Sequence, residues 1–294
     1  MNAYSTRPAA FGLIAGCIIF GLGSLIVAAV PVGAYAIAFW RLAVAAVVFY
    51  LLLRLQGRRL PASRRARVFA LLSGTFLGVD LALWHESIYA VGPGIATLLN
   101  SLQIFFLAAI GFVWFGERQS RLQLFSLLLA VAGVALIASP EFGRNQHAAW
   151  GLISGIVSGS MLAVSMTFVR KTHEAEPTPL LPLMLLVSLG GMAAMLLPAW
   201  WFDQGRLYPT QARDIGLILI YGAVMQCLAW GLIAHAIPKL SLALTGLLLL
   251  SEPVAALLID AWVLGKAIDG WQWAGAALTL AAIYLGSAFG KQAT

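Results

Sequence analysis

Long, uninterrupted apolar runs follow one another along almost the whole chain, separated by short polar breaks. A membrane-spanning helix needs about 20 mainly apolar residues, whereas a strand of a transmembrane barrel alternates apolar and polar residues over about 10. The runs show no such alternation, so the pattern predicts an all-α membrane protein with ten transmembrane helices. We place these helices at residues 10–30, 33–53, 68–90, 93–115, 121–139, 148–169, 179–201, 214–236, 240–263 and 271–290.

The composition leaves little for any part outside the membrane. Of the 294 residues, 61% are hydrophobic and 10% are charged, and the mean hydropathy is +0.92. Soluble domains carry about 25% charged residues, so this chain has too little polar surface to cover a water-soluble globule. No polar stretch is longer than about a dozen residues, which leaves no room for a soluble domain. We therefore expect the lipid bilayer as a partner.

Basic residues gather on one side of the predicted membrane. One set of loops contains thirteen of them, namely Arg7, Arg54, Arg58, Arg59, Arg64, Arg65, Arg67, Arg118, Arg121, Arg170, Lys171, Lys239 and Lys291. The opposite set contains four, namely Arg144, Arg206, Arg213 and Lys266. Because cytoplasmic loops carry an excess of Lys and Arg, both termini are predicted to be cytoplasmic in a bacterial inner membrane.

The net charge of +7 is carried by short loops between apolar runs, so membrane orientation explains it and no nucleic-acid partner is expected. The densest basic segment, residues 54–67, leaves a second interpretation open. It could bind anionic lipid or a partner protein as a specific function, although topology and general lipid contact suffice to explain it.

The two halves of the chain repeat each other. Gly116-Glu117-Arg118, after the fourth run, corresponds to Gly265-Lys266-Ala267, after the ninth, at an offset of 149 residues. Each half, residues 1–139 and 140–294, holds five predicted spans, and an odd number of spans turns the second half upside down in the membrane. Inverted repeats commonly place a solute site near the midplane, where one half rocks against the other. The repeat therefore predicts a transporter.

Polar side chains inside the spans are costly, which makes them candidates for function. Glu252 lies near the middle of the ninth span, where it could bind an ammonium group or carry a coupling proton. Alternatively, its carboxyl group stabilises the turn that Pro253 disturbs. Gln103, at the repeat-related position of the fourth span, could orient a polar substrate or bridge two helices. Asn100 lies three residues before Gln103, on the same helical face.

Arg41 in the second span and Asp80 in the third lie at comparable depth. A direct pair would cancel two expensive charges, so we expect Arg41 and Asp80 to form a structural ion pair. In the alternative, Arg41 binds a substrate carboxylate through two parallel hydrogen bonds, while Asp80 faces the substrate's amine.

Aromatic and amide side chains complete the predicted substrate-binding set. Trp84 and His85, toward the outer end of the third span, could form a wall that holds an apolar side chain and donates hydrogen bonds. An interfacial aromatic belt is the alternative. Gln226 and Trp230 share a face of the eighth span at four-residue spacing, although Trp230 could equally face lipid or core. The full predicted set is Trp84, His85, Asn100, Gln103, Gln226, Trp230 and Glu252.

Motifs of other protein classes are missing from the sequence. It contains no P-loop, zinc-protease or dinucleotide motif and no cluster with metal-ligand spacing, so we expect no metal, no cofactor and no enzyme activity. A nucleotide-driven pump would need a domain for which there is no room. A membrane-embedded enzyme is disfavoured by the missing catalytic cluster, and a scaffold by the repeat.

Several segments resemble EamA-type members of the drug/metabolite transporter superfamily. They are Ser87–Asn100, Gly116–Ser120, Ala236–Ser241, Leu250–Pro253 and Arg41 early in the second span. The Glu252-Pro253 pair is the most characteristic. Its first-half equivalent is Gln103-Ile104, so a symmetric role for the two positions is not expected.

Within this family, the chain is similar to bacterial amino-acid exporters of the YddG type. The resemblance implies two inverted five-helix repeats around a central cavity, lined by helices 1, 3, 4, 6, 8 and 9. It also implies export of amino acids, aromatic ones among them, or of related small metabolites. We expect a monomer, and a cationic drug or another metabolite is the rival solute.

Overall fold

The computed structural model describes residues 3–138, 148–255 and 269–288, and over these residues it contains helices and no strands. This confirms the predicted all-α class. The helices are α1 (Ala3–Gly21), α2 (Gly23–Ala29), α3 (Ala34–Leu55), α4 (Arg64–Val91), α5 (Pro93–Ser101), α6 (Gln103–Phe115), α7 (Arg121–Ala138), α8 (Ala148–Ala175), α9 (Leu180–Phe202), α10 (Ala212–Ile220), the π-helix η2 (Tyr221–Ala229), α11 (Trp230–Ala236), the 3₁₀ turn η3 (Ile237–Lys239), α12 (Leu242–Leu249) and α14 (Gly270–Ala288).

Six helical segments in the described part of the chain are long and apolar enough to cross a bilayer. Three shorter apolar segments accompany them, at Leu99–Phe115, Arg121–Gly133 and Leu244–Ala255. Large apolar side chains cover the outside of the bundle: Leu197 is 75% exposed and Trp201 is 72% exposed. Such a surface is unfavourable in water but suits contact with lipid. The chain is therefore a helical, multi-pass membrane protein.

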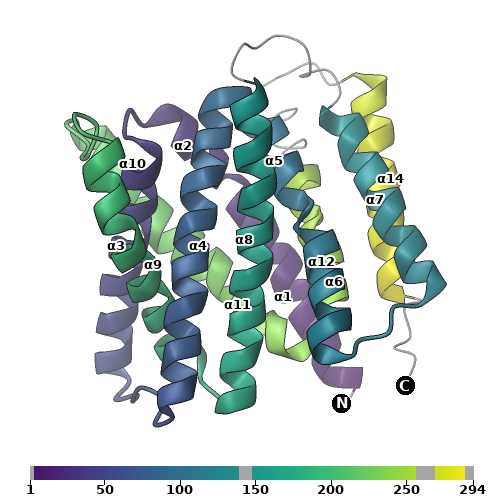
Figure 1. Cartoon of the computed structure of the whole chain (residues 1–294), viewed down its shortest axis with the longest axis horizontal. Coiled ribbons are helices and arrows are strands. Elements are labelled where there is room, and N and C mark those ends of the chain that lie inside the picture. Colours follow the sequence, from purple (N-terminus) through teal and green to yellow (C-terminus); the bar gives the residue numbers. More distant parts are fainter. Residues whose placement is uncertain (1–2, 139–147, 256–268, 289–294) are drawn as a thin grey trace.

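Figure 1 shows the helices as an upright bundle, with α7 and α14 packed together along one side of it. The start of α1 and the end of α14 lie at the same end of the bundle as the turn between α3 and α4. The Gly265–Ala267 part of the repeat match lies outside the described residues, as do Arg144, Lys266 and Lys291.

Glycine allows the backbones of α4 and α9 to touch. A Cβ atom on Gly74 would lie 1.9 Å from the carbonyl oxygen of Val187, and one on Gly190 would lie 2.2 Å from that of Leu71. Lipid supplies no hydrophobic drive between helices, so close contact between small residues is a main source of their association. This contact fixes α4, which carries much of the polar interior.

Two helices are interrupted at corresponding places in the two halves. The backbone turns at Leu102, between α5 and α6, and again at Leu250, after α12. In both turns an i→i+3 hydrogen bond of 3.1–3.2 Å replaces the usual helical one. Gln103 follows the first turn directly and Glu252 follows the second by two residues. Interrupted helices at matched positions are characteristic of solute sites in transporters with internal repeats.

The α4–α9 contact yields a test of packing. Gly74→Ala should lower the free energy of unfolding by about 1–3 kcal/mol, because the added methyl group meets backbone that cannot move aside. Gly216→Ala in α10 is the matched control, since a Cβ atom there meets nothing within 4 Å, and it should be neutral or slightly stabilising. Thermal unfolding in detergent measures both. Equal melting temperatures for the two variants would contradict the packing described here.

Candidate functional site

Arg41 is the centre of a buried polar cluster formed by α3, α4 and η2. Its side chain is 0% exposed. The Nε atom donates a 2.8 Å hydrogen bond to Gln226 Oε1, and Nη1 donates a 2.7 Å bond to the Tyr221 hydroxyl. The guanidinium also lies over two rings, 4.6 Å from the centroid of Phe20 and 4.4 Å from that of Tyr221. Hydrogen bonds to Gln226 and Tyr221 and the contacts with two aromatic rings therefore fix the position of the guanidinium group.

His85 supports this arrangement through Tyr221. Its Nδ1 atom lies 3.0 Å from the Ala34 carbonyl oxygen, and its Nε2 atom lies 2.9 Å from the Tyr221 hydroxyl. A carbonyl oxygen can only accept, so Nδ1 carries the proton and Nε2 accepts from the hydroxyl. The Tyr221 hydroxyl thus accepts from Arg41 and donates to His85. Both nitrogens of His85 have protein partners, so His85 positions Tyr221, and its predicted contact with a solute stays a prediction.

The π-helix η2 makes the two contacts with Arg41 possible. Tyr221 and Gln226 are five residues apart, and in an α-helix such residues point about 140° away from each other. A π-helix closes each turn with i→i+5 hydrogen bonds, which brings residues five apart onto one face. Trp230 follows directly after η2 and is 2% exposed. The unusual backbone therefore turns both Tyr221 and Gln226 toward Arg41.

A second group of hydrogen bonds surrounds Asp80. Its Oδ1 atom accepts from Asn100 Nδ2 at 2.8 Å and from the Ser158 hydroxyl at 2.7 Å. These bonds join α4, α5 and α8. They also bring the predicted residue Asn100 to Asp80, whereas Gln103 has no partner for its Oε1 atom.

The expected direct ion pair between Arg41 and Asp80 is not formed, although the structure describes both residues. The two groups still interact electrostatically at longer range. Each finds neutral partners on other helices instead: Arg41 binds an amide and a phenol, and Asp80 binds an amide and a hydroxyl. The two charges are thus solvated by the protein without neutralising each other. The alternative, in which Arg41 binds a substrate carboxylate through two hydrogen bonds, stays a prediction; of the three guanidinium nitrogens, Nη2 has no partner among the described residues.

Five buried polar atoms in this region have no hydrogen-bond partner among the described residues. They are the donors Arg41 Nη2, Gln226 Nε2, Trp84 Nε1 and Trp230 Nε1 and the acceptor Gln103 Oε1. An unsatisfied buried polar group costs about 1–3 kcal/mol, so such a concentration calls for water or a polar solute. Four of the five belong to residues that the sequence predicted as substrate-binding.

Phe20 joins the two tryptophans into one aromatic surface. Its ring centroid lies 6.0 Å from that of Trp84 and 6.3 Å from that of Trp230. Arg41 lies against the same ring. An apolar surface therefore lies directly beside the unpaired donors, and a solute with both an apolar part and an anionic group would match it.

Glu252 lies near this cluster on the side of α1 and α12. It interacts electrostatically with Asp80 and Arg41, and also with Cys17, one turn before Phe20 on α1. The side chain is half-buried, and in the described part of the chain it has neither an ion pair nor a hydrogen bond. The interior thus holds two carboxyl groups and one guanidinium.

Three members of the cluster are not among the residues predicted from the sequence. Phe20 lies in an unbroken apolar run, where nothing distinguishes it from its neighbours. Ser158 is a small polar residue of the kind that helix packing usually explains, but its hydroxyl donates a hydrogen bond to Asp80. Tyr221 could have been found, since it is a polar aromatic residue within a span, but α-helical spacing points it away from Gln226.

Known proteins resemble both halves of this chain. The model of the EamA-like transporter family matches twice, at residues 7–139 and at residues 149–288. A crystal structure described only as "Crystal structure of protein" superposes with a TM-score of 0.78, at 16% identity and with 99% of this chain and 98% of that chain covered. At this identity the match bears on the fold alone.

Three curated relatives are similar at the level of sequence. The "Uncharacterized transporter YetK" of Bacillus subtilis is 26% identical over 97% of this chain and 86% of its own length. The "Probable amino-acid metabolite efflux pump" of Salmonella typhimurium is 26% identical, over 67% and 68%. The "Pseudopaline exporter CntI" of Pseudomonas aeruginosa is 25% identical, over 64% and 63%.

These matches agree with the resemblance found in the sequence. The relatives are transporters or efflux pumps and not enzymes. Together with the helical, multi-pass architecture, they make this protein a membrane transporter. Since the family model matches both halves of the chain, the protein belongs to the EamA-like transporter family.

Proposed function

We propose that this protein exports amino acids or related small metabolites across a bacterial inner membrane by alternating access. The observation that carries the proposal is the group of unpaired buried donors and acceptors around Arg41. Those atoms lie beside one aromatic surface and near the two interrupted helices. A small zwitterion with an apolar side chain supplies what each of them lacks.

The donors suit the carboxylate of such a solute. Arg41 Nη2 offers one charged hydrogen bond, and the indole N–H groups of Trp84 and Trp230 offer neutral ones. Charge-assisted hydrogen bonds are the stronger kind. Phe20, between the two indole rings, would contact the apolar side chain of the solute.

The acceptors suit the ammonium group. Glu252 has no hydrogen-bond partner in the described part of the chain, and Gln103 Oε1 is likewise free. Asn100 would contribute by holding Asp80 in place. With Asp80 and Glu252 against Arg41, the interior favours a solute that carries a positive group, which is why the proposal names a zwitterion and not an anion.

The proposed topology has ten spans in two inverted repeats, residues 1–139 and 140–294, around a central cavity that opens during transport. The excess of Lys and Arg in one set of loops supports cytoplasmic termini. Nothing in the proposed mechanism requires a second chain.

Alternating access is supported by how deeply the cluster is buried. Trp84, Gln103 and Trp230 are each 2–3% exposed, so a solute reaches them only when helices move apart. The turns at Leu102 and Leu250 interrupt α5–α6 and α12 near these groups. Such interruptions allow one half-helix to tilt without breaking a full set of backbone hydrogen bonds.

A purely cationic solute is the second candidate, favoured by the two carboxyl groups. It would leave Arg41 Nη2 and both indole N–H groups unpaired. The same panel of solutes distinguishes the two candidates.

Transport itself is tested in liposomes loaded with labelled amino acids, their amides or lipophilic cations. We expect protein-dependent flux of apolar amino acids, and at least tenfold slower flux of the matching amides, because the amides lack the carboxylate that Arg41 would bind. Empty liposomes give the background. No protein-dependent flux of any solute, with either sign of pH gradient, would refute the proposal.

Removal of an indole N–H should separate binding from folding. Trp84→Phe and Trp230→Phe each remove an unpaired donor and should weaken solute binding about tenfold without lowering the melting temperature. Trp40→Phe is the matched control, because its Nε1 atom already donates a 2.7 Å hydrogen bond to the Leu207 carbonyl oxygen. It should lower stability and leave affinity unchanged. The reverse pattern would exclude the two indoles from the site.

Coupling to protons is tested at Glu252. If its carboxyl group carries the coupling proton, Glu252→Gln should abolish the dependence of flux on the pH gradient while downhill exchange of solute continues. Glu86→Gln makes the same chemical change outside the cluster, where Glu86 accepts from Trp150 Nε1 at 3.1 Å, and should leave the dependence intact. An unchanged pH dependence in Glu252→Gln would leave Glu252 without this role.

A further inference from the structure

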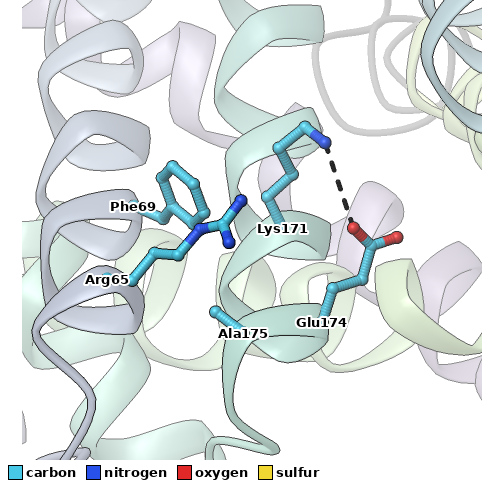
Figure 2. Close-up of a pocket in the computed structure, with 5 residues that line it drawn as sticks. All are labelled: Arg65, Phe69, Lys171, Glu174 and Ala175. Atoms are coloured by element: carbon cyan, nitrogen blue, oxygen red, sulfur yellow. Dashed lines mark ion pairs between the residues drawn. The ribbon is translucent and has the colours of Figure 1, made fainter.

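A small pocket lies between α4 and α8, apart from the polar cluster and at the end of the bundle where basic residues gather. Figure 2 shows its lining: Arg65 and Phe69 from α4, and Lys171, Glu174 and Ala175 from α8. Its volume is about 120 Å³. Arg65 extends from α4 toward α8, so two helices each contribute one cation to the same space.

The positive charge of this pocket is not balanced by the protein. Glu174 is the one carboxylate in the lining, and it is shared between Lys171 at 4.0 Å and Arg170 at 3.8 Å. Arg65 has no ion pair and no hydrogen bond in the described part of the chain. Its guanidinium lies 5.3 Å from the centroid of the Phe69 ring. Lys171 Nζ, by contrast, also lies 4.8 Å from the centroid of the Phe115 ring. A negatively charged group would therefore be attracted mainly by Arg65, with Lys171 as the second cation of the lining.

The surroundings strengthen this attraction. Arg64 and Arg67, in the same first turn of α4, are exposed, and that turn contains no acidic residue. The other carboxylate nearby, Glu176, is occupied by the backbone N–H groups of Ala62 and Ser63, at 3.1 and 2.6 Å. Glu117 is paired with Arg170. The cations at this end, Arg64, Arg65, Arg67, Arg170 and Lys171, outnumber the carboxylates Glu117, Glu174 and Glu176 by five to three, so the net charge around the pocket is positive.

Three phenylalanine rings, those of Phe69, Phe168 and Phe76, form a row along α4 and α8 that begins at the pocket, and we call this row the aromatic seam. The ring of Phe168 lies 5.7 Å from that of Phe69 and 5.7 Å from that of Phe76, and it stacks on Phe76 at an interplanar angle of 5°. All three rings are partly exposed. Phe69 and Phe76 are seven residues apart, a rise of about 10 Å along the helix. The pocket and the seam together form one continuous surface that is cationic at its end and apolar along its length.

We propose that this surface is a binding site for an anionic phospholipid. The phosphate of the headgroup lies between Arg65 and Lys171, and an acyl chain lies along Phe69, Phe168 and Phe76. Basic pockets at the ends of transmembrane helices attract acidic headgroups, and the seam explains why the ligand is a lipid and not a free anion. The bound lipid joins α4 to α8, one helix from each half of the chain.

The test measures lipid binding directly. Purified protein in neutral detergent is titrated with phosphatidylglycerol, with phosphatidylcholine of the same acyl chains, or with inorganic phosphate, and bound lipid is counted by native mass spectrometry. Wild-type protein should retain one phosphatidylglycerol in preference to phosphatidylcholine. Arg65→Gln and Lys171→Gln should each weaken its binding about fivefold, since a cation near the headgroup contributes roughly that factor.

Arg58→Gln is the matched control, because it removes one exposed cation from the turn between α3 and α4, outside the pocket. It should change binding less than twofold, and melting temperatures without lipid should be equal for all three variants. Equal loss in Arg58→Gln would mean general charge attraction and would overturn the proposal. So would equal retention of phosphatidylcholine, or displacement of the lipid by millimolar inorganic phosphate.

Discussion

A polar group inside a bilayer is cut off from bulk water, so its hydrogen bonds have to come from the protein, from water enclosed by the protein or from a solute. Arg41 shows how far this constraint determines the interior. Its guanidinium has two hydrogen bonds, to Gln226 and Tyr221, and two ring contacts, yet Nη2 has none. These contacts require α1, α3 and η2 to pack in a fixed arrangement, and η2 departs from α-helical geometry.

The architecture around Arg41 follows from that need. The π-helix η2 turns Tyr221 and Gln226 to one side, and His85 fixes the direction of the Tyr221 hydroxyl. Five residues before His85 on α4, Asp80 is solvated separately by groups from α5 and α8. Arg41 and Asp80 therefore each have neutral hydrogen-bond partners in place of each other. We propose that a solute binds the donors that remain unpaired.

Much of the fold could be predicted from the sequence, because a bilayer imposes a simple pattern. The expected span 33–53 corresponds to α3, at Ala34–Leu55, and 179–201 to α9, at Leu180–Phe202. The turn at Leu102 could not be predicted, because no proline or glycine lies beside it, and its polar neighbours Ser101 and Gln103 are residue types that also occur within unbroken helices. Periodicity also assumes 3.6 residues per turn, so it could not reveal η2 and with it the role of Tyr221.

The polar residues of the site were predictable as a set but not as partners. Arg41, Asp80 and Gln226 could be identified because polar and charged side chains are rare within the apolar spans. The partners of each residue depend on how the helices are rotated about their axes and on residues of other helices, such as Ser158. Residue spacing along the sequence gives neither the rotation nor these partners. The expected Arg41–Asp80 pair was wrong for this reason.

A structure of the protein with its transported solute bound tests the central claim most directly. The account predicts the solute beside Phe20, with an anionic oxygen within hydrogen-bond distance of Arg41 Nη2 and of an indole nitrogen of Trp84 or Trp230. A solute bound elsewhere, with these donors still unpaired or bonded only to water, would contradict it.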